Sequence, residues 1–303
     1  MGEGGLAGAG GADSPPEPEV PPEPMEWVPR APVPTLRTEQ AATVVGDRIY
    51  VGGGFEDLRA FNAYLPETDE WVTLEPMPGG RHHYGITTYD GNVYLFAGAR
   101  TVTAWRYNVA TDDWTDLEDL PLERSSGMAV TLGDYMYYVG GAGVDPTVTQ
   151  RYNPATDEWD TVAEISVLRD HGGAVVLDEK IYAIGGRGGG NFLTTVEIYD
   201  PALDMWSPGP SMVHARSGFG TVVWKGHIVA CGGEVRVDGT PIALDTCEAL
   251  PPGADEWEEW PSLPQGTHGT AMANYQDRIF ILGGSTEGFA IAPTPDVFEL
   301  VFQ

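Results

Sequence analysis

The stretch "YNPATDEW" occupies residues 152–159, and residues 107–114 repeat it almost letter for letter as "YNVATDDW". Three looser copies are "YLPETDEW" at 64–71, "YDPALDMW" at 199–206 and "LPPGADEW" at 250–257. Five copies of one phrase make an internal repeat. A repeat of this length defines the architecture before any single element is considered.

A second recurring feature is a Gly pair that closes a short apolar run, as in "MYYVGG" and "IYAIGG". The first residue of this pair follows a Trp by 26 residues in every copy, starting from Trp27, Trp71, Trp114, Trp159, Trp206 and Trp257. The distance from the pair to the following Trp varies between 17 and 25 residues. One half of the unit therefore has a fixed length, and one loop accepts all the insertions.

Each unit contains four short runs with the alternation and turn residues of strands. Four strands in each repeat of 43–51 residues predict an all-β, six-bladed β-propeller with four antiparallel strands per blade. The chain ends on a third strand near 296–302, and it begins with an isolated Trp strand near 26–34. We therefore expect the N-terminal strand to complete the last blade, which removes two open sheet edges.

These features resemble the kelch family: a Gly pair after the second strand, a Tyr seven residues before a Trp, and an Arg that opens the first strand. The resemblance covers residues 26–302. Leu250 replaces the Tyr in blade five, and Ala97 replaces the first Gly in blade two, but neither departure changes the spacing. The resemblance implies a ligand or protein site around the channel mouth, and bacterial six-bladed members include a sialic acid mutarotase.

The chain is strongly acidic, with a net charge of −29 and only 16 Lys and Arg among its 303 residues. Such a surface repels nucleic acids and anionic membranes, so we expect neither as a partner. No run of 18 apolar residues is present. Cys231 and Cys247 lie on strands expected to be neighbours, which leaves open a disulfide or a pair of buried thiols.

Residues 1–24 differ in kind from the propeller predicted over 25–303. They are rich in Gly and Ala, then in Pro and Glu, and predict a flexible tether. Such a leader resembles the mature start of an exported bacterial lipoprotein, with Met1 in place of the lipid-bearing Cys; an ordinary disordered terminus is the alternative. We expect an extracellular or periplasmic monomer that contacts membranes only through a lipid anchor.

The first strand of five blades opens with an arginine on the face where the variable loops lie. These residues are Arg37, Arg81, Arg124, Arg169 and Arg216, with Thr267 in blade six. Two interpretations remain open: a structural role within the kelch framework, or a ring of ligand-binding cations for an anion or carboxylate at the channel mouth.

Two residues after these positions, the blades carry Glu39, His83, Ser126, His171, Gly218 and His268 in turn, if blade six holds one extra residue. Three of the six His of the chain would then occupy one level of alternate blades, about 120° apart around the channel. Three imidazoles are a ligand set for zinc and also suit copper and iron. The sequence thus predicts a transition-metal site formed by His83, His171 and His268.

Four neighbouring residues are candidates for orienting the metal ligands or for binding the ligand itself: Glu39, His82, Tyr84 and Asp170. Catalysis at such a metal stays open. Two metal-free functions are the alternatives: a binding module for a protein or glycan, and a sugar mutarotase or epimerase that acts on a small molecule.

Overall fold

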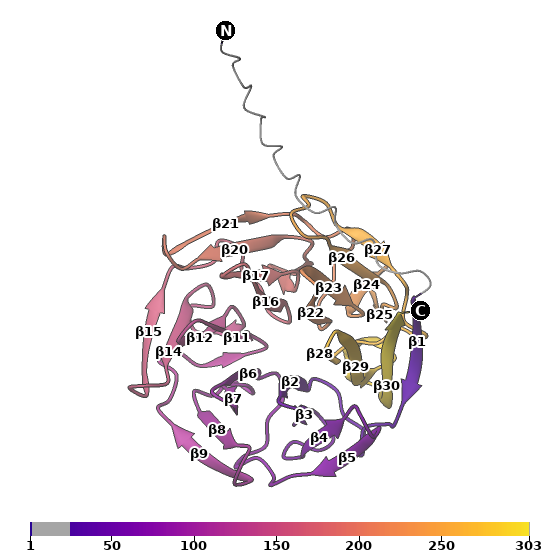
Figure 1. Ribbon diagram of the computed structural model, residues 1–303, viewed down its shortest axis with the longest axis horizontal. Coiled ribbons are helices and arrows are strands. Elements are labelled where there is room, and N and C mark those ends of the chain that lie inside the picture. The colour runs from indigo at the N-terminus through magenta and orange to yellow at the C-terminus, as the bar shows by residue number, and fades with distance from the viewer. Residues whose placement is uncertain (2–24, 303) are drawn as a thin grey trace.

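The structure, a computed structural model, describes Met1 and residues 25–302, so the tether predicted over 1–24 lies outside the described residues except for Met1. Six four-stranded antiparallel sheets surround a central channel, as Figure 1 shows. The predicted six-bladed propeller is confirmed. Among the described residues, no helix is long and apolar enough to cross a membrane.

The strands of each blade are given from the channel outward. Blade one consists of β2 (Ala41–Val45), β3 (Arg48–Gly52), β4 (Phe61–Leu65) and β5 (Glu70–Thr73), and blade two of β6 (Gly85–Tyr89), β7 (Asn92–Phe96), β8 (Ala104–Asn108) and β9 (Asp113–Leu117). Blade three consists of β11 (Met128–Leu132), β12 (Tyr135–Val139), β14 (Thr149–Asn153) and β15 (Glu158–Val162). Blade four consists of β16 (Gly173–Leu177), β17 (Lys180–Ile184), β20 (Val196–Asp200) and β21 (Met205–Gly209), and blade five of β22 (Gly220–Trp224), β23 (His227–Cys231), β26 (Cys247–Leu250) and β27 (Glu258–Trp260). Blade six consists of β28 (Ala271–Tyr275), β29 (Arg278–Ser285), β30 (Pro293–Phe302) and β1 (Met25–Arg30).

Short accessory elements lie in the loops between the blades. They are β10 (Arg124–Ser125) with β13 (Ala142–Gly143), β18 (Arg187–Gly188) with β19 (Asn191–Phe192), β24 (Glu234–Val237) with β25 (Thr240–Ala243), and the 3₁₀ helix η1 (Gly288–Ala290). Most of them extend the loops that follow the Gly pairs, which are the loops of variable length.

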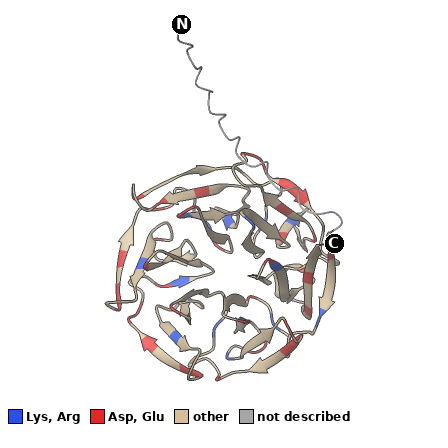
Figure 2. Cartoon of the chain, in the orientation of Figure 1, with Lys and Arg blue, Asp and Glu red and all other residues tan. Residues whose placement is uncertain are grey.

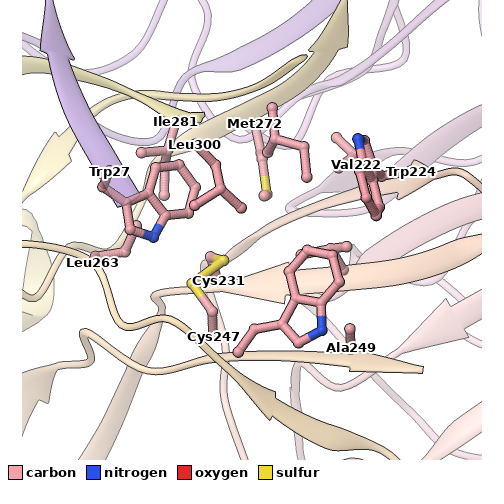
Figure 3. Close-up of a cluster of buried hydrophobic side chains, with 13 residues drawn as sticks. Trp27, Val222, Trp224, Cys231, Cys247, Ala249, Leu263, Met272, Ile281 and Leu300 are labelled. Carbon is pink, nitrogen blue, oxygen red and sulfur yellow. A yellow bond between two sulfur atoms is a disulfide. The ribbon is translucent and has the colours of Figure 1, made fainter. Parts of the chain in front are cut away.

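The two ends of the described chain close the ring within blade six. Strand β1 pairs antiparallel with β30, which places Trp27 opposite Leu300. Both side chains belong to the apolar layer between blades five and six, together with Trp224 and Met272 (Figure 3). Closure therefore contributes buried apolar area as well as backbone hydrogen bonds.

Cys231 and Cys247 lie in the same apolar layer and form a disulfide (Figure 3). They are direct partners on the neighbouring strands β23 and β26, and both are buried. Of the two alternatives that the sequence left open, the structure has the disulfide.

The Gly pairs permit close approach between adjacent blades. Gly140 and Gly141 have φ values of 64° and 91°, in the left-handed region that suits Gly. A Cβ at Gly140 would lie 2.6 Å from the carbonyl oxygen of Arg169 in the next blade. Ala97 adopts a φ of 58° at the corresponding position of blade two, so the backbone course is the same there.

The repeated phrase "YNxATDxW" is a clamp on the preceding blade. Tyr107 donates its hydroxyl hydrogen to Asp112 at 2.6 Å, and Asp112 also accepts the backbone N–H of Glu75 at 2.9 Å. Trp114 donates its indole N–H to the carbonyl oxygen of Glu75 at 2.9 Å. Both polar groups of one backbone unit in blade one are thus satisfied by blade two. The same set recurs around Asp69, Asp157 and Asp204.

Blades five and six keep only the Trp part of the clamp. The Trp257 indole donates to the carbonyl oxygen of Pro210, and the Trp27 indole donates to that of Pro261. A proline has no N–H to offer. In these two blades the Tyr position is held by Leu250 and Leu300. The departure at Leu250 therefore has a physical reason, because no N–H of the clamped residue remains to be bonded.

Acidic side chains are prominent on the outermost strands. Figure 2 shows acidic residues on β9, β15 and β27, where the side chains of Asp113, Asp116, Glu158, Asp160, Glu258 and Glu259 are exposed. The high negative charge therefore lies in part on the circumference of the disc, where water solvates it.

We expect the clamp to be measurable in the free energy of unfolding. Tyr107→Phe removes the hydroxyl that bonds Asp112, and should lower the stability by about 1 kcal/mol in urea unfolding. Tyr182→Phe is the control, because the Tyr182 hydroxyl makes no hydrogen bond to the described residues. Equal losses in the two variants would contradict the clamp.

Candidate functional site at the channel mouth

The loops that open each blade are joined by a closed ring of six backbone hydrogen bonds. In each blade one residue donates its N–H to the carbonyl oxygen of the equivalent residue in the preceding blade, over distances of 2.7–3.2 Å. All six have φ between 51° and 63°. We call these residues the inner tier: Glu39, His83, Ser126, His171, Gly218 and Gly269.

The preceding residue of each loop forms a second level, which we call the outer tier: Thr38, His82, Ser125, Asp170, Ser217 and His268. Outer-tier residues pair with the residue that follows the Gly pair of their own blade. The N–H of Asp170 bonds the carbonyl oxygen of Arg187 at 2.9 Å, and that of His268 bonds Ser285 at 2.9 Å.

The tiers correct the register predicted for blade six. The inner-tier residue there is Gly269, and no extra residue is needed to align the blade. His268 belongs to the outer tier with His82 and Asp170. The three histidines predicted for alternate blades therefore do not occupy one level.

Three inner-tier side chains converge instead: Glu39, His83 and His171. One ligand atom of each lies within 4.8 Å of the other two. His83 Nε2 is 3.3 Å from Glu39 Oε2, and the ring centroids of His83 and His171 are 4.8 Å apart. All three line the channel, which has a volume of about 170 Å³.

Each of the three converging side chains is held by an outer-tier residue. The Nδ1 of His83 contacts the Nδ1 of His82, and the Nδ1 of His171 contacts the carboxylate of Asp170. Glu39 is approached by the Nε2 of His268, at 3.4 Å from its Oε1. His82, Asp170 and His268 thus each contact one of the three converging side chains.

Two further residues complete the charged surroundings, and the sequence did not point to them. Arg187 donates to Asp170 at 2.9 Å and to Glu234 at 3.1 Å, and its Nη2 lies 3.4 Å from His171 Nε2. Glu234 lies 3.6 Å from His268 Nε2. Both residues directly follow a Gly pair, and that position was the signal that could have revealed them.

The site shifts the protonation of its members. Burial alone would raise the pKa of Glu39, but the hydrogen bond with His268 and the charges of His83, His171 and His268 lower it to about 2. Burial lowers the pKa of His83 to about 4 against the opposing effect of Glu39. Burial would also raise the pKa of Asp170, but His171 and Arg187 lower it.

The repeat arginines are not open to the channel mouth. Four of them are fully buried: Arg37, Arg124, Arg169 and Arg216. Arg169 and Arg216 donate to the carbonyl oxygen of the first Gly of their own blade's pair and to a buried Glu. Arg81 is half-buried and stacks on Trp105 at 4.3 Å. They hold the framework together, so a cationic ring around the mouth is not what the structure shows.

Tyr84 is also placed in the framework. It is buried, and its hydroxyl donates to the carbonyl oxygen of Gly52 in blade one. Burial raises its pKa. Tyr84 lines the channel wall, but its hydroxyl is engaged by the neighbouring blade.

Known proteins match this chain in its repeat and in its fold. The Kelch motif model matches residues 168–213. The kelch repeat protein M-T8 of Myxoma virus is 28% identical over 35% of this chain and 20% of its own length. Kelch-like protein 7 of Rattus norvegicus is 30% identical over 31% of this chain and 16% of its own length. The chain thus covers only a minor part of these relatives.

A solved structure, titled "Structure of YjhT", superposes with a TM-score of 0.77 over 90% of this chain and 98% of its own, at 17% identity. At that identity the likeness concerns the fold alone. The motif match, the relatives and the six repeats agree with one another. The chain is a kelch-repeat protein.

Proposed function

We propose that the channel mouth binds one first-row transition-metal ion through Glu39, His83 and His171. The observation that carries the proposal is the convergence of their ligand atoms within 4.8 Å of one another. Donors that share one ion at about 2.0–2.2 Å lie roughly 3–4 Å apart. The three ligand atoms therefore need to approach one another to share an ion.

The donor chemistry fits such an ion. Two imidazoles and one carboxylate with open positions are the ligand set of non-haem iron(II) sites, and they also suit zinc. The lowered pKa values keep His83 neutral and Glu39 charged at neutral pH, which are the forms that bind metal. Copper, zinc and iron remain the candidate ions. When bound, the ion would supply Lewis acidity at its open positions.

The surrounding contacts support the same proposal. Metal-bound imidazoles usually donate their second ring nitrogen to a carboxylate, carbonyl or comparable acceptor. The Asp170 carboxylate faces the Nδ1 of His171, which leaves the Nε2 of His171, 3.4 Å from the Nη2 of Arg187, as the ring nitrogen for a metal. The Nδ1 of His83 is engaged with His82, so His83 also presents its Nε2.

Export from the cytoplasm is part of the proposal. The disulfide between Cys231 and Cys247 supports an oxidising compartment, because such bonds are rare in the reducing cytosol. Both sulfurs are buried in an apolar layer, so the bond acts on stability and not on the site chemistry.

Protein binding at the same face is the second candidate function. Exposed apolar side chains project from the loops around the mouth, including Phe55, Val144, Val237, Phe289 and Ile291. Clusters of exposed apolar residues often mark interaction sites. Such a partner would cover the mouth without needing a metal.

Metal binding can be tested with untagged protein stripped by a chelator. We expect one Zn²⁺, or one Fe²⁺ without oxygen, per chain in calorimetric titration. His83→Asn, His171→Asn and Glu39→Gln should each weaken binding by more than about 100-fold, since loss of an outer-shell partner alone costs 10- to 100-fold. His214→Asn is the control, because His214 is a half-exposed histidine whose ring lies near Glu259 and outside the site.

Wild-type affinity in all three ligand variants would contradict the metal site. Binding of a free monosaccharide by the metal-free protein, retained in His83→Asn, would instead favour the sugar mutarotase or epimerase alternative. Binding of a protein partner with equal affinity in the presence and absence of chelator would favour the interaction module.

The metal-free protein should lose stability as the pH falls from about 6.5 to about 4. The pKa of His83 is about 4 in the folded state against about 6.5 unfolded, so the unfolded chain takes up the proton first. The loss should be on the order of 2–3 kcal/mol in urea unfolding. Glu39, whose folded pKa is about 2, adds a further loss below about pH 4.5.

His83→Asn should flatten the upper part of this profile, while His214→Asn should follow the wild type. Parallel profiles for wild type and His83→Asn between pH 6.5 and pH 4 would contradict the assigned pKa of His83.

A further inference from the structure

Blade one differs from blades four and five in what faces its repeat arginine. In blade four, Arg169 donates to the Glu197 carboxylate at 2.8 Å, and in blade five Arg216 donates to Glu248 at 2.7 Å. All four side chains are buried. A buried guanidinium is thus paired with a buried carboxylate, as the cost of desolvating a charge requires.

In blade one the carboxylate is replaced by the amide of Asn62. Asn62 lies opposite Val51 on β3, as Glu197 lies opposite Ala183 on β17. Arg37 donates to Asn62 Oδ1 at 2.5 Å and to the carbonyl oxygen of Thr35 at 3.4 Å. Arg37 is fully buried, and its Nη1 has no hydrogen-bond partner among the described residues.

Within the described residues, the remaining blades contain no buried guanidinium that is equally short of hydrogen-bond acceptors. Arg124 in blade three is surrounded by backbone carbonyl oxygens, including those of Asp145 and Val148. Arg81 in blade two is only half-buried. Blade six has the neutral Thr267. Arg37 therefore combines full burial with a shortage of acceptors.

A cavity of about 370 Å³ is lined by residues that contact this guanidinium, while Arg37 itself is fully buried and does not line it. Both residues that Arg37 contacts, Thr35 and Asn62, line the cavity. Its charged walls are Asp57 and Arg59. Burial lowers the pKa of Arg37, and the charge of Asp57 opposes this lowering without forming a direct ion pair. With Arg37 behind the wall, the local formal charge is positive in a chain of net charge −29. Apolar side chains complete the lining: Pro34, Ala60, Phe61, Leu74 and Pro76.

In blades four and five, backbone amides also bind the Glu carboxylate that pairs with the repeat arginine. The Glu197 carboxylate accepts the amides of Ser166 and Val167, and that of Glu248 accepts those of Val213 and His214. Counted from the Trp of each repeat, the equivalents in blade one are Pro34 and Thr35. Pro34 has no N–H, but the amide of Thr35 holds the position of the His214 amide.

We propose that this cavity binds a small monocarboxylate, whose carboxylate takes the place that Glu197 and Glu248 occupy in their blades. Asn62 and the amide of Thr35 are the recognising groups, Arg37 supplies positive charge from behind Asn62, and Thr73 adds a hydroxyl to the lining. The apolar walls accept a short aliphatic group. This site is separate from the metal site and does not depend on it.

Acetate is the probe for the experiment, added to the full chain at constant ionic strength by replacing chloride. We expect a saturable rise in melting temperature, and saturable amide shifts at Thr35 and Asn62 in NMR spectra, with a midpoint in the millimolar range. Asn62→Glu supplies the carboxylate internally, so it should abolish both acetate responses and raise the melting temperature without acetate.

Asn191→Glu is the charge control, because Asn191 is exposed on β19, and it should keep the acetate response. If Asn62→Glu fails to fold, Asn62→Asp and the NMR titration of the wild type take its place. A wild type that responds equally to acetate and chloride would overturn the proposal, as would an acetate response retained in Asn62→Glu. An acetate response that appears only in Asp57→Asn would also overturn it, since Asp57 would then be the counter-ion of Arg37.

Discussion

The closed ring of six backbone hydrogen bonds at the channel mouth is the constraint on which the rest of the structure depends. It joins every blade to the next through equivalent residues, including blade six to blade one through Glu39 and Gly269. Because each member has the same left-handed backbone, the side chains start from one level and one direction. A residue placed on the ring is therefore brought close to residues more than 80 positions away in the sequence.

Some positions of the ring hold a non-glycine residue in a backbone conformation that is strained for it. Gly218 and Gly269 adopt the left-handed conformation without strain, but Glu39, His83 and His171 hold it with a Cβ, which disfavours it by roughly 1–2 kcal/mol per residue. Strain of this kind gathers at functional sites. The three strained residues with ionisable side chains are the three that converge, which agrees with a binding role for them.

The inner tier and the outer tier have different roles in the site. The inner tier presents donors to the channel, and the outer tier, through His82, Asp170 and His268, fixes their orientation and charge. Arg187 and Glu234 extend this network from the variable loops. Loop insertions can therefore alter the surroundings of the donors while the ring, built from segments of constant length, stays unchanged.

The blade count and the closure could be predicted from the sequence because the spacing from Trp to the Gly pair is constant and because the two ends carry complementary strands. Leu250 could be recognised as a departure, but its reason, the missing N–H of Pro210, needed the contacts between blades. The position of His268 was predicted wrongly because "HGTAM" resembles "HGGAV", although Thr267 at the arginine position gave the correct register. The framework role of the buried Arg37, Arg169 and Arg216 was one of two open interpretations, because the sequence does not show to which side of the loop a long side chain turns.

Hydrogen exchange of the six ring amides, measured residue by residue by NMR, tests the role of the ring most directly. If the ring closes the propeller, the amides of Glu39, His83, Ser126, His171, Gly218 and Gly269 should exchange only through global unfolding, with similar and high protection despite lying in loops. Rapid exchange at some of these amides, while the strands of the same blades stay protected, would show that the blades are held without the ring.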